Sequence, residues 1–544
     1  MSSQIELPPE QRNSNVEFES SPKNYVLISV SDKTGIVDFA GRLEHLGYTI
    51  ISTGGTGRTL TENGIQFTPI QEITGNPEAF DGRMKTISWQ VEGGILYDRF
   101  KDSHVKQAQK LGLPDIQMVV CNLYPFTQTI YKPDFTMDEA VENIDVGGPT
   151  MVRAAAKNHK SVLVVTDPSN YDQVIEAIAS NQITSEFRQE LAARAFAHLA
   201  NYDAQIASFL NKEKFPKEKP IPLVRGNMNV RYGDNPDQEA EFYVVPGEER
   251  DSPIARLKRC SGREPSTTNL TDIDAGIKVV RMFDYPAAVV IKHNTPCGIA
   301  CGVAIGDDIS EILARALDSD PESAFGGVVV LNRPMGEPEA RVIESFKKSG
   351  RGQMDIIATP DISEKGLTLI SEVRKTTGVY TFGDLPKFSP RGNLIKSVDG
   401  GFIVQDENNP EASFPNWKVV TEVQPTPEQL GQMKVGWKLI ARIKSNTVLV
   451  VDKLLPMVRG IGSGQTSRVR STKIALECAG EFTKGGILVS DSFFPFADSV
   501  KMAIKSGIAA IIQQGGSVND QQSIDVANHA GIPMVFTGQR LFWH

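Results

Sequence analysis

A lysine and a histidine stand together at the end of a short apolar segment. Residues 287–291 are five consecutive apolar residues bounded by turn-forming residues, which predicts a buried strand. Lys292 and His293 follow directly, and we expect the chain to leave extended geometry over residues 294–296. An ammonium group and an imidazole at the rim of a sheet suit stabilisation of an oxyanion and transfer of a proton. A strand that simply ends in solvated polar residues fits this stretch equally well.

Two predicted strand ends near the N-terminus carry groups that suit a phosphate. Lys33 follows a strand at residues 25–30 and lies beside the start of a helix. After a second strand at residues 48–52 the chain reads Thr-Gly-Gly-Thr-Gly, a loop that lets backbone N–H groups approach an anion. Neither loop has the spacing of a Walker or dinucleotide-binding motif, so the sequence predicts only a generic phosphate site. Glycine-rich turns between strands and helices are the alternative.

Further charged residues lie beside predicted turns. Arg83 and Lys85 would share one side of an extended segment. Asp145 precedes a Gly-Gly-Pro turn into a helical segment that includes Lys157, and if both are buried they are tolerable only as partners. Alternatively each charge is solvated and the aspartate only caps the helix. Residues 460–468, which contain three glycines, predict a second flexible phosphate-type loop that opens a helix.

Length and composition limit the classes of protein. At 544 residues the chain is too long for one core, and roughly two to four domains are expected. With 40% hydrophobic and 23% charged residues it resembles an ordinary soluble protein. A formal net charge of −9 argues against nucleic acid as its main partner. No apolar run approaches the roughly 20 residues of a membrane helix, so no membrane partner is expected.

The N-terminal segment and the cysteines indicate a cellular compartment. Residues 1–24 are polar and acidic, without the apolar core of a secretory signal or the basic character of a transit peptide, and we expect a disordered tail. The five cysteines are scattered, and an odd number in a long chain indicates reduced thiols. Together these features predict a cytoplasmic protein.

The order of predicted elements indicates two α/β domains. Strands and helices alternate over residues 25–215, which predicts a parallel sheet and includes a long amphipathic helix at residues 185–210. The charged, proline-rich stretch at residues 211–222 is the best domain boundary. Residues 223–544 are again α/β, with more antiparallel signals. A pattern of helix, strand and polar tip occurs twice between about residues 269 and 510, which hints at a duplicated subdomain.

Taken together, these segments resemble a bifunctional purine biosynthesis family, AICAR transformylase/IMP cyclohydrolase. Five segments resemble the cyclohydrolase half of this family: Ser29-Val-Ser-Asp-Lys-Thr-Gly35, Ser52-Thr-Gly-Gly-Thr56, Cys121-Asn-Leu-Tyr-Pro-Phe126, Ile144-Asp-Val-Gly-Gly148 and Arg153-Ala-Ala-Ala-Lys-Asn-His159. Five others resemble the transformylase half: Arg231-Tyr-Gly233, Lys292-His293, Lys444-Ser-Asn446, Gly464-Gln-Thr-Ser-Arg468 and Asp491-Ser-Phe-Phe-Pro-Phe496. The motifs run in order from about residue 25 to the C-terminus. The resemblance implies a methylglyoxal-synthase-like first domain, a second domain of two cytidine-deaminase-like subdomains, and an intertwined homodimer.

The resemblance also implies two reactions. The aromatic amine of AICAR attacks the formyl group of the cosubstrate 10-formyltetrahydrofolate, with His293 as general base and Lys292 on the oxyanion or the leaving nitrogen. Asn446 would orient His293 or hold the formyl oxygen. The formylated product, formyl-AICAR, then closes to IMP with loss of water. The residues assigned to substrate binding in the transformylase half are Arg231, Asn269, Arg468, Phe493, Phe496, Asp498, Arg540 and His544.

In the cyclohydrolase half the resemblance assigns acid–base roles to Lys85, Tyr124, Asp145 and Lys157. Lys33, Ser52, Thr56 and Arg83 would hold the phosphate. Neither step needs a metal or a tightly bound cofactor. The deaminase-like fold raises the question of zinc, but no His-x-Glu with Cys-x-x-Cys is present, so we expect none.

Three departures from the family pattern leave alternatives open. The usual Lys-Thr-Leu-His-Pro becomes Lys85-Thr-Ile-Ser-Trp89, the histidine of Arg-Tyr-Gly-x-Asn-Pro-His-Gln becomes Asp237, and Ser-Tyr-Asn-Asn becomes Ser266-Thr-Thr-Asn269. The first could reshape the cyclohydrolase pocket, and a carboxylate near a phosphate would weaken binding. The groups assigned to bond-making remain, so we expect an active enzyme in which one activity is open to impairment. The alternatives are a transformylase-only enzyme and a non-catalytic purine-nucleotide or folate sensor.

Overall fold

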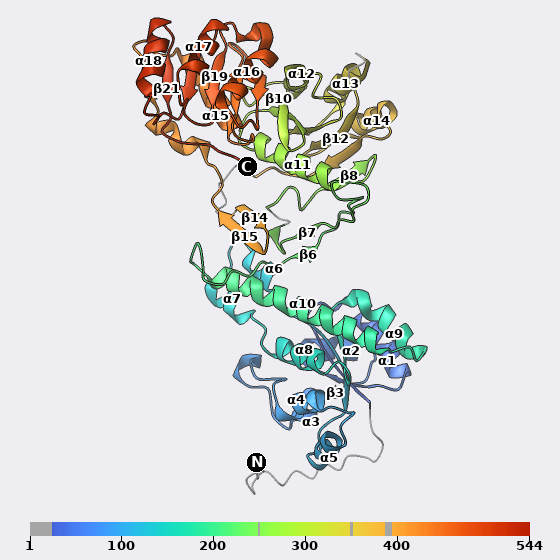
Figure 1. Ribbon diagram of the computed structural model, residues 1–544. Helices are drawn as coiled ribbons and strands as arrows, with labels where there is room; N and C mark the ends of the chain where they lie inside the picture. Colours follow the sequence, from blue (N-terminus) through green and yellow to red (C-terminus); the bar gives the residue numbers. More distant parts are fainter. Residues whose placement is uncertain (1–23, 249–250, 349–351, 387–393) are drawn as a thin grey trace. The chain divides into compact units, whose positions relative to one another are not determined.

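The computed structural model describes residues 24–248, 251–348, 352–386 and 394–544. The chain forms two compact units, Met1–Leu223 (unit 1) and Val224–His544 (unit 2), and Figure 1 shows the elements of each. The expected disordered tail at residues 1–24 falls, except for Asn24, outside the described residues. No helix of the described residues combines the length and apolarity needed to cross a membrane.

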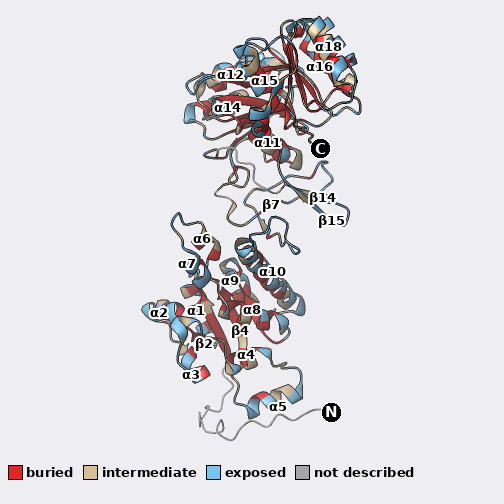
Figure 2. Ribbon diagram, turned by 90° about the vertical axis from the view of Figure 1, so that its left-hand side faces the viewer, coloured by how far each residue is buried: buried red, intermediate tan, exposed pale blue. Residues whose placement is uncertain are grey.

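Unit 1 is built on a five-stranded sheet with strand order β3-β2-β1-β4-β5, in which every neighbouring pair is parallel. Its central strands are apolar runs buried on both faces, which Figure 2 shows as red ribbon, and this is the pattern of a parallel sheet covered by helices. The α/β class with a parallel sheet expected for this part of the chain is therefore confirmed. The strands are β1 (Tyr25–Val30), β2 (Thr49–Ser52), β3 (Thr68–Pro69), β4 (Ile116–Asn122) and β5 (Leu163–Val165).

The helices of unit 1 follow the strands along the chain. They are α1 (Ile36–His45), α2 (Gly54–Glu62), α3 (Ile70–Thr74), α4 (Trp89–Leu96), α5 (Asp102–Lys110), α6 (Phe126–Ile130), α7 (Met137–Glu142), α8 (Gly147–Lys157), α9 (Tyr171–Ala179) and α10 (Ser185–Leu210). The long helix α10 has the bounds that the sequence predicts, and Thr184 caps it by accepting a hydrogen bond from the backbone N–H of Phe187.

Unit 2 contains two six-stranded mixed sheets. The first subdomain has the strand order β10-β9-β11-β12-β13-β8, and the second has β18-β17-β19-β20-β21-β16. The strands of the first are β8 (Lys258–Ser261), β9 (Ala287–Lys292), β10 (Thr295–Cys301), β11 (Gly327–Leu331), β12 (Met354–Thr359) and β13 (Gly378–Thr381). Those of the second are β16 (Lys418–Val419), β17 (Val448–Val451), β18 (Val458–Gly462), β19 (Ile487–Ser490), β20 (Ala510–Gln513) and β21 (Met534–Phe536).

The two subdomains share one topology, which confirms the duplication that the sequence only hinted at. Each begins with an edge strand and a helix, continues through an antiparallel hairpin, and ends in three parallel strands joined by helices. The helices of the first are α11 (Thr267–Val280), α12 (Ile309–Ser319), α13 (Glu337–Phe346) and α14 (Glu364–Val373). The helices of the second are α15 (Pro427–Ile440), α16 (Arg468–Ala479), α17 (Asp498–Lys505) and α18 (Asp520–His529).

The subdomains meet through the edge strands β10 and β18. Ala300 forms an antiparallel bridge with Met457, and the backbone N–H of Cys301 donates to the carbonyl of Pro456 at 3.0 Å. Because the two edges run in opposite directions, the start of β10 and the end of β18 point to the same side of unit 2. The end of β9, with Lys292 and His293, is therefore on the same side as the segment that follows β18.

Two expectations from the sequence are wrong in detail. The chain does not leave extended geometry after Asn294, because Thr295 and Pro296 already belong to β10, which tolerates a proline as an edge strand. Gly460 and Gly462 belong to β18 and not to a phosphate-type loop. A methyl group on Gly460 would lie 2.1 Å from the carbonyl oxygen of Ala475, so this glycine allows α16 to pack closely on the strand.

Unit 2 also contains two small antiparallel ribbons. One pairs β6 (Val224–Arg225) with β7 (Tyr243–Val244), and the other pairs β14 (Leu394–Val398) with β15 (Gly401–Gln405). The second ribbon exposes several large apolar side chains, namely Ile395, Val398, Phe402 and Ile403. Exposed apolar side chains in this number on one short ribbon are typical of a surface that another chain covers.

Candidate active site

In unit 1, two lysines converge on the glycine-rich loop at the start of α2. A methyl group on Gly54 would lie 2.4 Å from Nζ of Lys85, and one on Gly55 would lie 4.0 Å from Nζ of Lys33. Free backbone N–H groups at the start of a helix and two ammonium groups form an arrangement that attracts an anion. The structure thus brings together the two cations and the loop that the sequence singled out.

Two hydroxyl groups predicted to hold the phosphate are buried and bonded to β1. The Ser52 hydroxyl donates to the carbonyl of Ile28 at 2.9 Å, and the Thr56 hydroxyl donates to the carbonyl of Val30 at 3.0 Å. These bonds fix the loop against the neighbouring strand. Contact of either hydroxyl with a phosphate stays a prediction.

Asp145, which precedes α8, lies near Tyr124, which precedes α6, and its carboxylate accepts the backbone N–H of Tyr124. The Asp145 carboxylate accepts the N–H of Gly148 at 2.9 Å, and a methyl group on Gly147 would lie 2.5 Å from Oγ1 of Thr86. Burial raises the pKa of Asp145, although hydrogen bonds from backbone N–H groups oppose the shift. Burial, together with the nearby Asp145 charge, also raises the pKa of Tyr124. A partly buried carboxyl near a phenol is an arrangement suited to proton transfer.

Two further predicted residues of unit 1 lie apart from this pair. Arg83 forms an exposed ion pair with Glu142. Lys157 is the last residue of the 11-residue helix α8, so it lies about 15 Å along the helix axis from the Asp145 end. The ion pair considered between Asp145 and Lys157 is therefore wrong within one chain. The catalytic role assigned to Lys157 stays a prediction.

In unit 2, His293 and Asn294 are the two residues of the turn that joins β9 to β10. Lys292 pairs with Thr295, and both turn residues are left-handed, with φ of 55° and 59°. Two-residue hairpins with this backbone match the twist of the strands. The turn presents the exposed His293 at its tip, while Nζ of Lys292 donates to the carbonyl of Phe325 at 2.8 Å.

Asp272, which was not among the residues predicted from the sequence, supports this turn through hydrogen bonds. Its carboxylate on α11 accepts the N–H of Asn294 at 2.6 Å and also a hydrogen bond from the N–H of His293. The residue is 7% exposed, and burial raises its pKa. A carboxylate at a buried position of an amphipathic helix was the available signal, because such a group needs specific donors. Asp272 is therefore a positioning residue for His293.

Asn446 is fixed by partners at both ends of its amide. Its oxygen accepts Nη2 of Arg468 at 2.7 Å, and its nitrogen donates to the carbonyl of Gln465 at 2.9 Å. Arg468 is 8% exposed and also forms an ion pair with Asp491, whose other carboxylate oxygen accepts the Ser445 hydroxyl. The guanidinium is thus engaged inside the chain, and its assigned contact with substrate stays a prediction.

Aromatic residues and the C-terminal residues surround this network. Phe496 is 60% exposed in the segment between β19 and α17, and Phe493 is half-buried. Asp498 is exposed at the start of α17. Arg540 lies 4.6 Å from the ring of Phe542, which the His544 ring contacts edge-on at 5.8 Å. The backbone N–H of Ser445 donates to the carbonyl of Trp543, so the C-terminal residues pack on the loop of Asn446.

Two other predicted substrate-binding residues lie on the first subdomain. Arg231 is exposed, and its Nε donates to the carbonyl of Glu264 at 2.6 Å. Asn269 is buried in a capping box at the start of α11, where its side chain accepts the N–H of Ser266 at 3.1 Å. The altered stretch 266–269 therefore still builds a helix cap. At a second of the three departures, residues 85–89, Ser88 caps α4 by accepting the N–H of Val91 at 3.1 Å.

The structure places His293 and Asn446 on the same side of unit 2, in different subdomains. Within the described residues no hydrogen bond joins the two side chains: the Asn446 amide is bonded to Gln465 and Arg468, whereas the His293 side chain is exposed. Elsewhere in the described ranges, no three His, Cys, Asp or Glu side chains are grouped as a metal site would need.

Comparisons with known proteins identify the family. The MGS-like domain family matches residues 35–150, and the AICARFT/IMPCHase bienzyme family matches residues 155–478. A protein of Oceanobacillus iheyensis named "Bifunctional purine biosynthesis protein PurH" is 41% identical over 521 residues, which cover 95% of this chain and 99% of the relative. A protein of the same name from Bacillus cereus (strain AH820) is 41% identical over 96% of this chain and all of the relative.

A solved structure described as "Crystal structure of ForH" is 33% identical and covers 35% of this chain and all of that chain, with a TM-score of 0.32. The full-length relatives and the family matches agree with the order of motifs along the sequence. The chain belongs to the AICARFT/IMPCHase bienzyme family of purine biosynthesis, whose two activities are formyl transfer to AICAR and closure of the product to IMP.

Proposed function

We propose that each reaction has its own unit, with formyl transfer in residues 223–544 and ring closure in residues 25–215. The observation that carries the first assignment is the left-handed turn that presents His293 beside Lys292, with Asn446 on the same side of the unit. The second rests on the two lysines at the α2 loop and on the Asp145 and Tyr124 pair.

In formyl transfer the amine of AICAR forms a bond to the formyl carbon of 10-formyltetrahydrofolate. The amine is a weak nucleophile because its lone pair is delocalised, so it must lose a proton as it attacks, and His293 takes that proton. Lys292 stabilises the oxyanion of the tetrahedral intermediate. When the bond from carbon to the folate nitrogen breaks, that nitrogen receives a proton from the imidazolium of His293 and leaves. Asn446, fixed by Arg468, orients these groups.

In ring closure the carboxamide nitrogen of formyl-AICAR bonds to the formyl carbon, and the formyl oxygen leaves as water. The step is intramolecular, so the protein supplies orientation and proton transfer more than a nucleophile. Asp145, whose pKa burial raises, and the nearby Tyr124 are the groups that exchange these protons. Lys85 and Lys33 hold the phosphate at the α2 loop, with Arg83, Ser52 and Thr56 around it and Lys157 as a further acid–base group.

Substrate binding in unit 2 is assigned by chemistry. Exposed Arg231 and Arg540 are suited to the phosphate or carboxamide of AICAR, and exposed Phe496 offers a ring face to the pterin or imidazole. Asp498 is available for polar recognition of the same ring. The remaining members of the proposed set, Asn269, Arg468, Phe493 and His544, act chiefly by holding these groups. No tightly bound cofactor is required, because the formyl donor is consumed as a cosubstrate.

The protein is further proposed to be a cytoplasmic homodimer. All five cysteines are unpaired, which suits a reducing compartment. The apolar β14–β15 ribbon offers a surface for a second copy of the chain. Light scattering should give a mass near twice 59.5 kDa, and Phe402→Asp should shift the protein toward the monomer. A wild-type monomer at micromolar concentration would contradict the dimer.

The direct test is a two-step assay on the full chain. Supplied with AICAR and 10-formyltetrahydrofolate, the protein should produce IMP, with absorbance changes for both steps. Accumulation of formyl-AICAR would show that ring closure is lost, and saturable nucleotide binding without turnover would reject both activities.

A further inference from the structure

One buried arginine of this protein lacks the partner that the others have. Four arginines are buried in the part of the chain that the structure describes. Three pair with carboxylates: Arg442 with Glu407 at 3.4 Å, Arg459 with Asp452 at 2.8 Å, and Arg468 with Asp491. Arg374, which follows α14 and is 6% exposed, pairs with none. A buried cation without an opposite charge is costly, so this exception calls for a cause.

The donors of Arg374 reach only neutral acceptors. Its Nη1 donates to the carbonyl of Gly352, and its Nη2 donates to the carbonyl of Ile343 at 3.3 Å. Its Nε is buried with no partner among the described residues. Burial lowers the pKa of Arg374, as expected where no anion balances the charge. Carbonyl groups satisfy hydrogen-bond geometry but leave the positive charge uncompensated.

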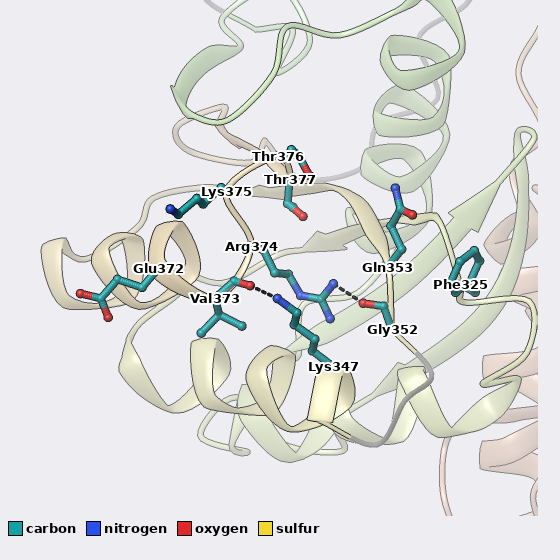
Figure 3. A pocket seen from close by; sticks show the side chains of 10 residues that line it. All are labelled: Phe325, Lys347, Gly352, Gln353, Glu372, Val373, Arg374, Lys375, Thr376 and Thr377. Carbon is teal, nitrogen blue, oxygen red and sulfur yellow. Dashed lines mark hydrogen bonds between the residues drawn. The ribbon is translucent and has the colours of Figure 1, made fainter.

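Arg374 lines a cavity of about 590 Å³ that contains more positive than negative groups. Lys347 and Lys375 also line it, and among the described lining residues only Glu372 is acidic. In Figure 3 Arg374 lies at the centre of the cluster, while the Glu372 carboxylate points away from it. Thr376 and Thr377 add hydroxyl groups to the same wall. A cavity of this composition favours an anion.

The cavity borders the formyl-transfer residues. Phe325 lines it, and the carbonyl of the same residue accepts Nζ of Lys292 at 2.8 Å. The other lining residues precede β12 and β13 at their amino ends, and the end of β9 lies at this same edge because β9 is antiparallel to β11. A ligand in the cavity would therefore lie at the same edge of the sheet as the turn that carries His293.

We propose that this cavity binds an oxyanion, a phosphate or a carboxylate, for which Arg374 is the buried counter-ion and Lys347 and Lys375 are the outer cations. The anion supplies the charge that the chain does not. Three oxyanions have this chemistry: the phosphate of AICAR, a carboxylate of the formyl donor, and free inorganic phosphate. Assignment to either substrate rests on the proposed function, whereas binding of the anion does not.

Binding is tested with inorganic phosphate on the full chain. Three of the four tryptophans lie in unit 2, so their fluorescence follows the thermal unfolding of that unit. Phosphate, compared with chloride at equal ionic strength, should raise the unfolding midpoint of the wild type. In Arg374→Met the apparent dissociation constant for phosphate should rise about tenfold or more. The matched control Lys348→Met, which removes a lysine that pairs with Glu344 and does not line the cavity, should behave as wild type.

Equal phosphate effects on the wild type and Arg374→Met, or no effect on either, overturn the proposal. Should Arg374→Met fail to fold, the double variant Lys347→Met with Lys375→Met replaces it, because both lysines are exposed and their loss leaves the core intact. For this variant too the phosphate dissociation constant should rise, and an unchanged constant overturns the proposal.

Steady-state kinetics of the same variants identify the source. A raised KM for AICAR with an unchanged KM for the formyl donor assigns the anion to the nucleotide phosphate, and the reverse assigns it to a folate carboxylate. Unchanged KM values with weakened phosphate binding assign the cavity to a free anion. If the wild type shows no formyl transfer, the proposed function fails while the phosphate titration still decides the anion site.

Discussion

The two subdomains of unit 2 have the same strand order but use their hairpins differently. In the first, the turn between β9 and β10 is two residues long and presents His293 to solvent. In the second, residues 452–457 connect β17 to β18, and the Asp452 carboxylate accepts the N–H groups of Leu454 and Leu455 as well as Nε of Arg459. Pro456 of this longer turn contacts β10. A short turn exposes a reactive side chain, whereas a long one closes on itself and joins the subdomains.

The two subdomains also differ at the end of the sheet that lies away from the hairpin tip. In the second subdomain the chemistry-bearing residues lie before β17 and after β19, where Asn446, Arg468 and Asp491 form one network. In the first subdomain, Asn332 occupies the corresponding place after β11, and its side chain bonds only the backbone of Ala287, Val280, Phe283 and Tyr285. The duplication therefore provides two similar frameworks with chemistry at the hairpin tip of one and at the far edge of the other.

The largest expected effect is at the tip that is exposed. His293→Ala should lower formyl transfer by about 10²–10⁴-fold, because the general base is lost. Ring closure of supplied formyl-AICAR should remain near wild type, since its residues lie in unit 1. Both rates are measured by absorbance on the same preparation. Parallel loss of the two activities would contradict the separation of the sites.

A second comparison uses two arginines with matched burial. Arg468→Met and Arg459→Met each leave a buried aspartate unpaired and should each lower the free energy of unfolding of unit 2 by about 3–5 kcal/mol. Only Arg468→Met should also reduce formyl transfer beyond the fraction of unfolded protein, because Arg468 holds Asn446. Urea unfolding and kcat at saturating substrate check the two effects. Equal kcat values in both variants would contradict the role of Asn446 in formyl transfer.

Two glycines test the structural equivalence of the subdomains. A methyl group on Gly298 would lie 2.0 Å from the carbonyl oxygen of Ala316, and one on Gly460 would lie 2.1 Å from that of Ala475. Gly298→Ala and Gly460→Ala should therefore destabilise unit 2 by similar amounts, about 2–3 kcal/mol each. Chemical denaturation measures both. Gly431→Ala, where nothing lies within 4 Å, is the control that should be neutral or slightly stabilising.

The smallest effect is a pH dependence of opposite sign under the two hairpins. Burial raises the pKa of Asp272 above its ordinary 3.8, so its contribution to stability decreases as pH rises above that value. For Asp452, burial alone would raise the pKa, but hydrogen bonds from Leu455 and Leu454 and the Arg459 charge outweigh it, and the pKa is lowered. The stability that Asp452 contributes is present above 3.8 and is lost as pH falls.

Consequently, Asp272→Asn should gain stability relative to wild type as pH rises from about 4 to 7. Asp452→Asn should instead lose stability relative to wild type as pH rises toward about 4 from below, because the wild type gains the contribution of Asp452 in that window. Urea unfolding of unit 2 at several pH values, followed by tryptophan fluorescence, measures both slopes. Slopes of the same sign would show that the two carboxylates have similar surroundings after all.

Local sequence patterns were sufficient for most elements and for some of the site. The apolar runs of β1 and β9 and the periodicity of α10 predict those elements because burial and spacing are local properties. Lys33 lies near the α2 loop because the parallel strands β1 and β2 end at one edge of the sheet, whereas Lys85 reaches the loop from a segment after α3, which no local pattern predicts. The glycines of β18 were wrongly predicted to form a phosphate-type loop, because glycine occurs both in anion-binding loops and where a helix packs closely on a strand.

Contacts across the sequence were not predictable in the same way. Asp272 lies 22 residues before Asn294, and no periodicity links a carboxylate on a helix to the turn above it. The ion pair of Arg468 with Asp491, which lies 23 residues later, is likewise not visible in any local pattern. The unpaired charge of Arg374 is visible only when its surroundings are known, since a sequence does not show which arginines are buried.

The left-handed turn at His293 and Asn294 has a consequence for laboratory evolution. Backbone in this region is disfavoured for residues with a side chain, and glycine relieves the penalty. A selection for heat resistance would therefore favour glycine at both turn positions. Glycine at position 294 should leave turnover intact. Glycine at position 293 would give a more stable protein that no longer transfers the formyl group. Screens of this protein for robustness should accordingly be coupled to a requirement for purine synthesis.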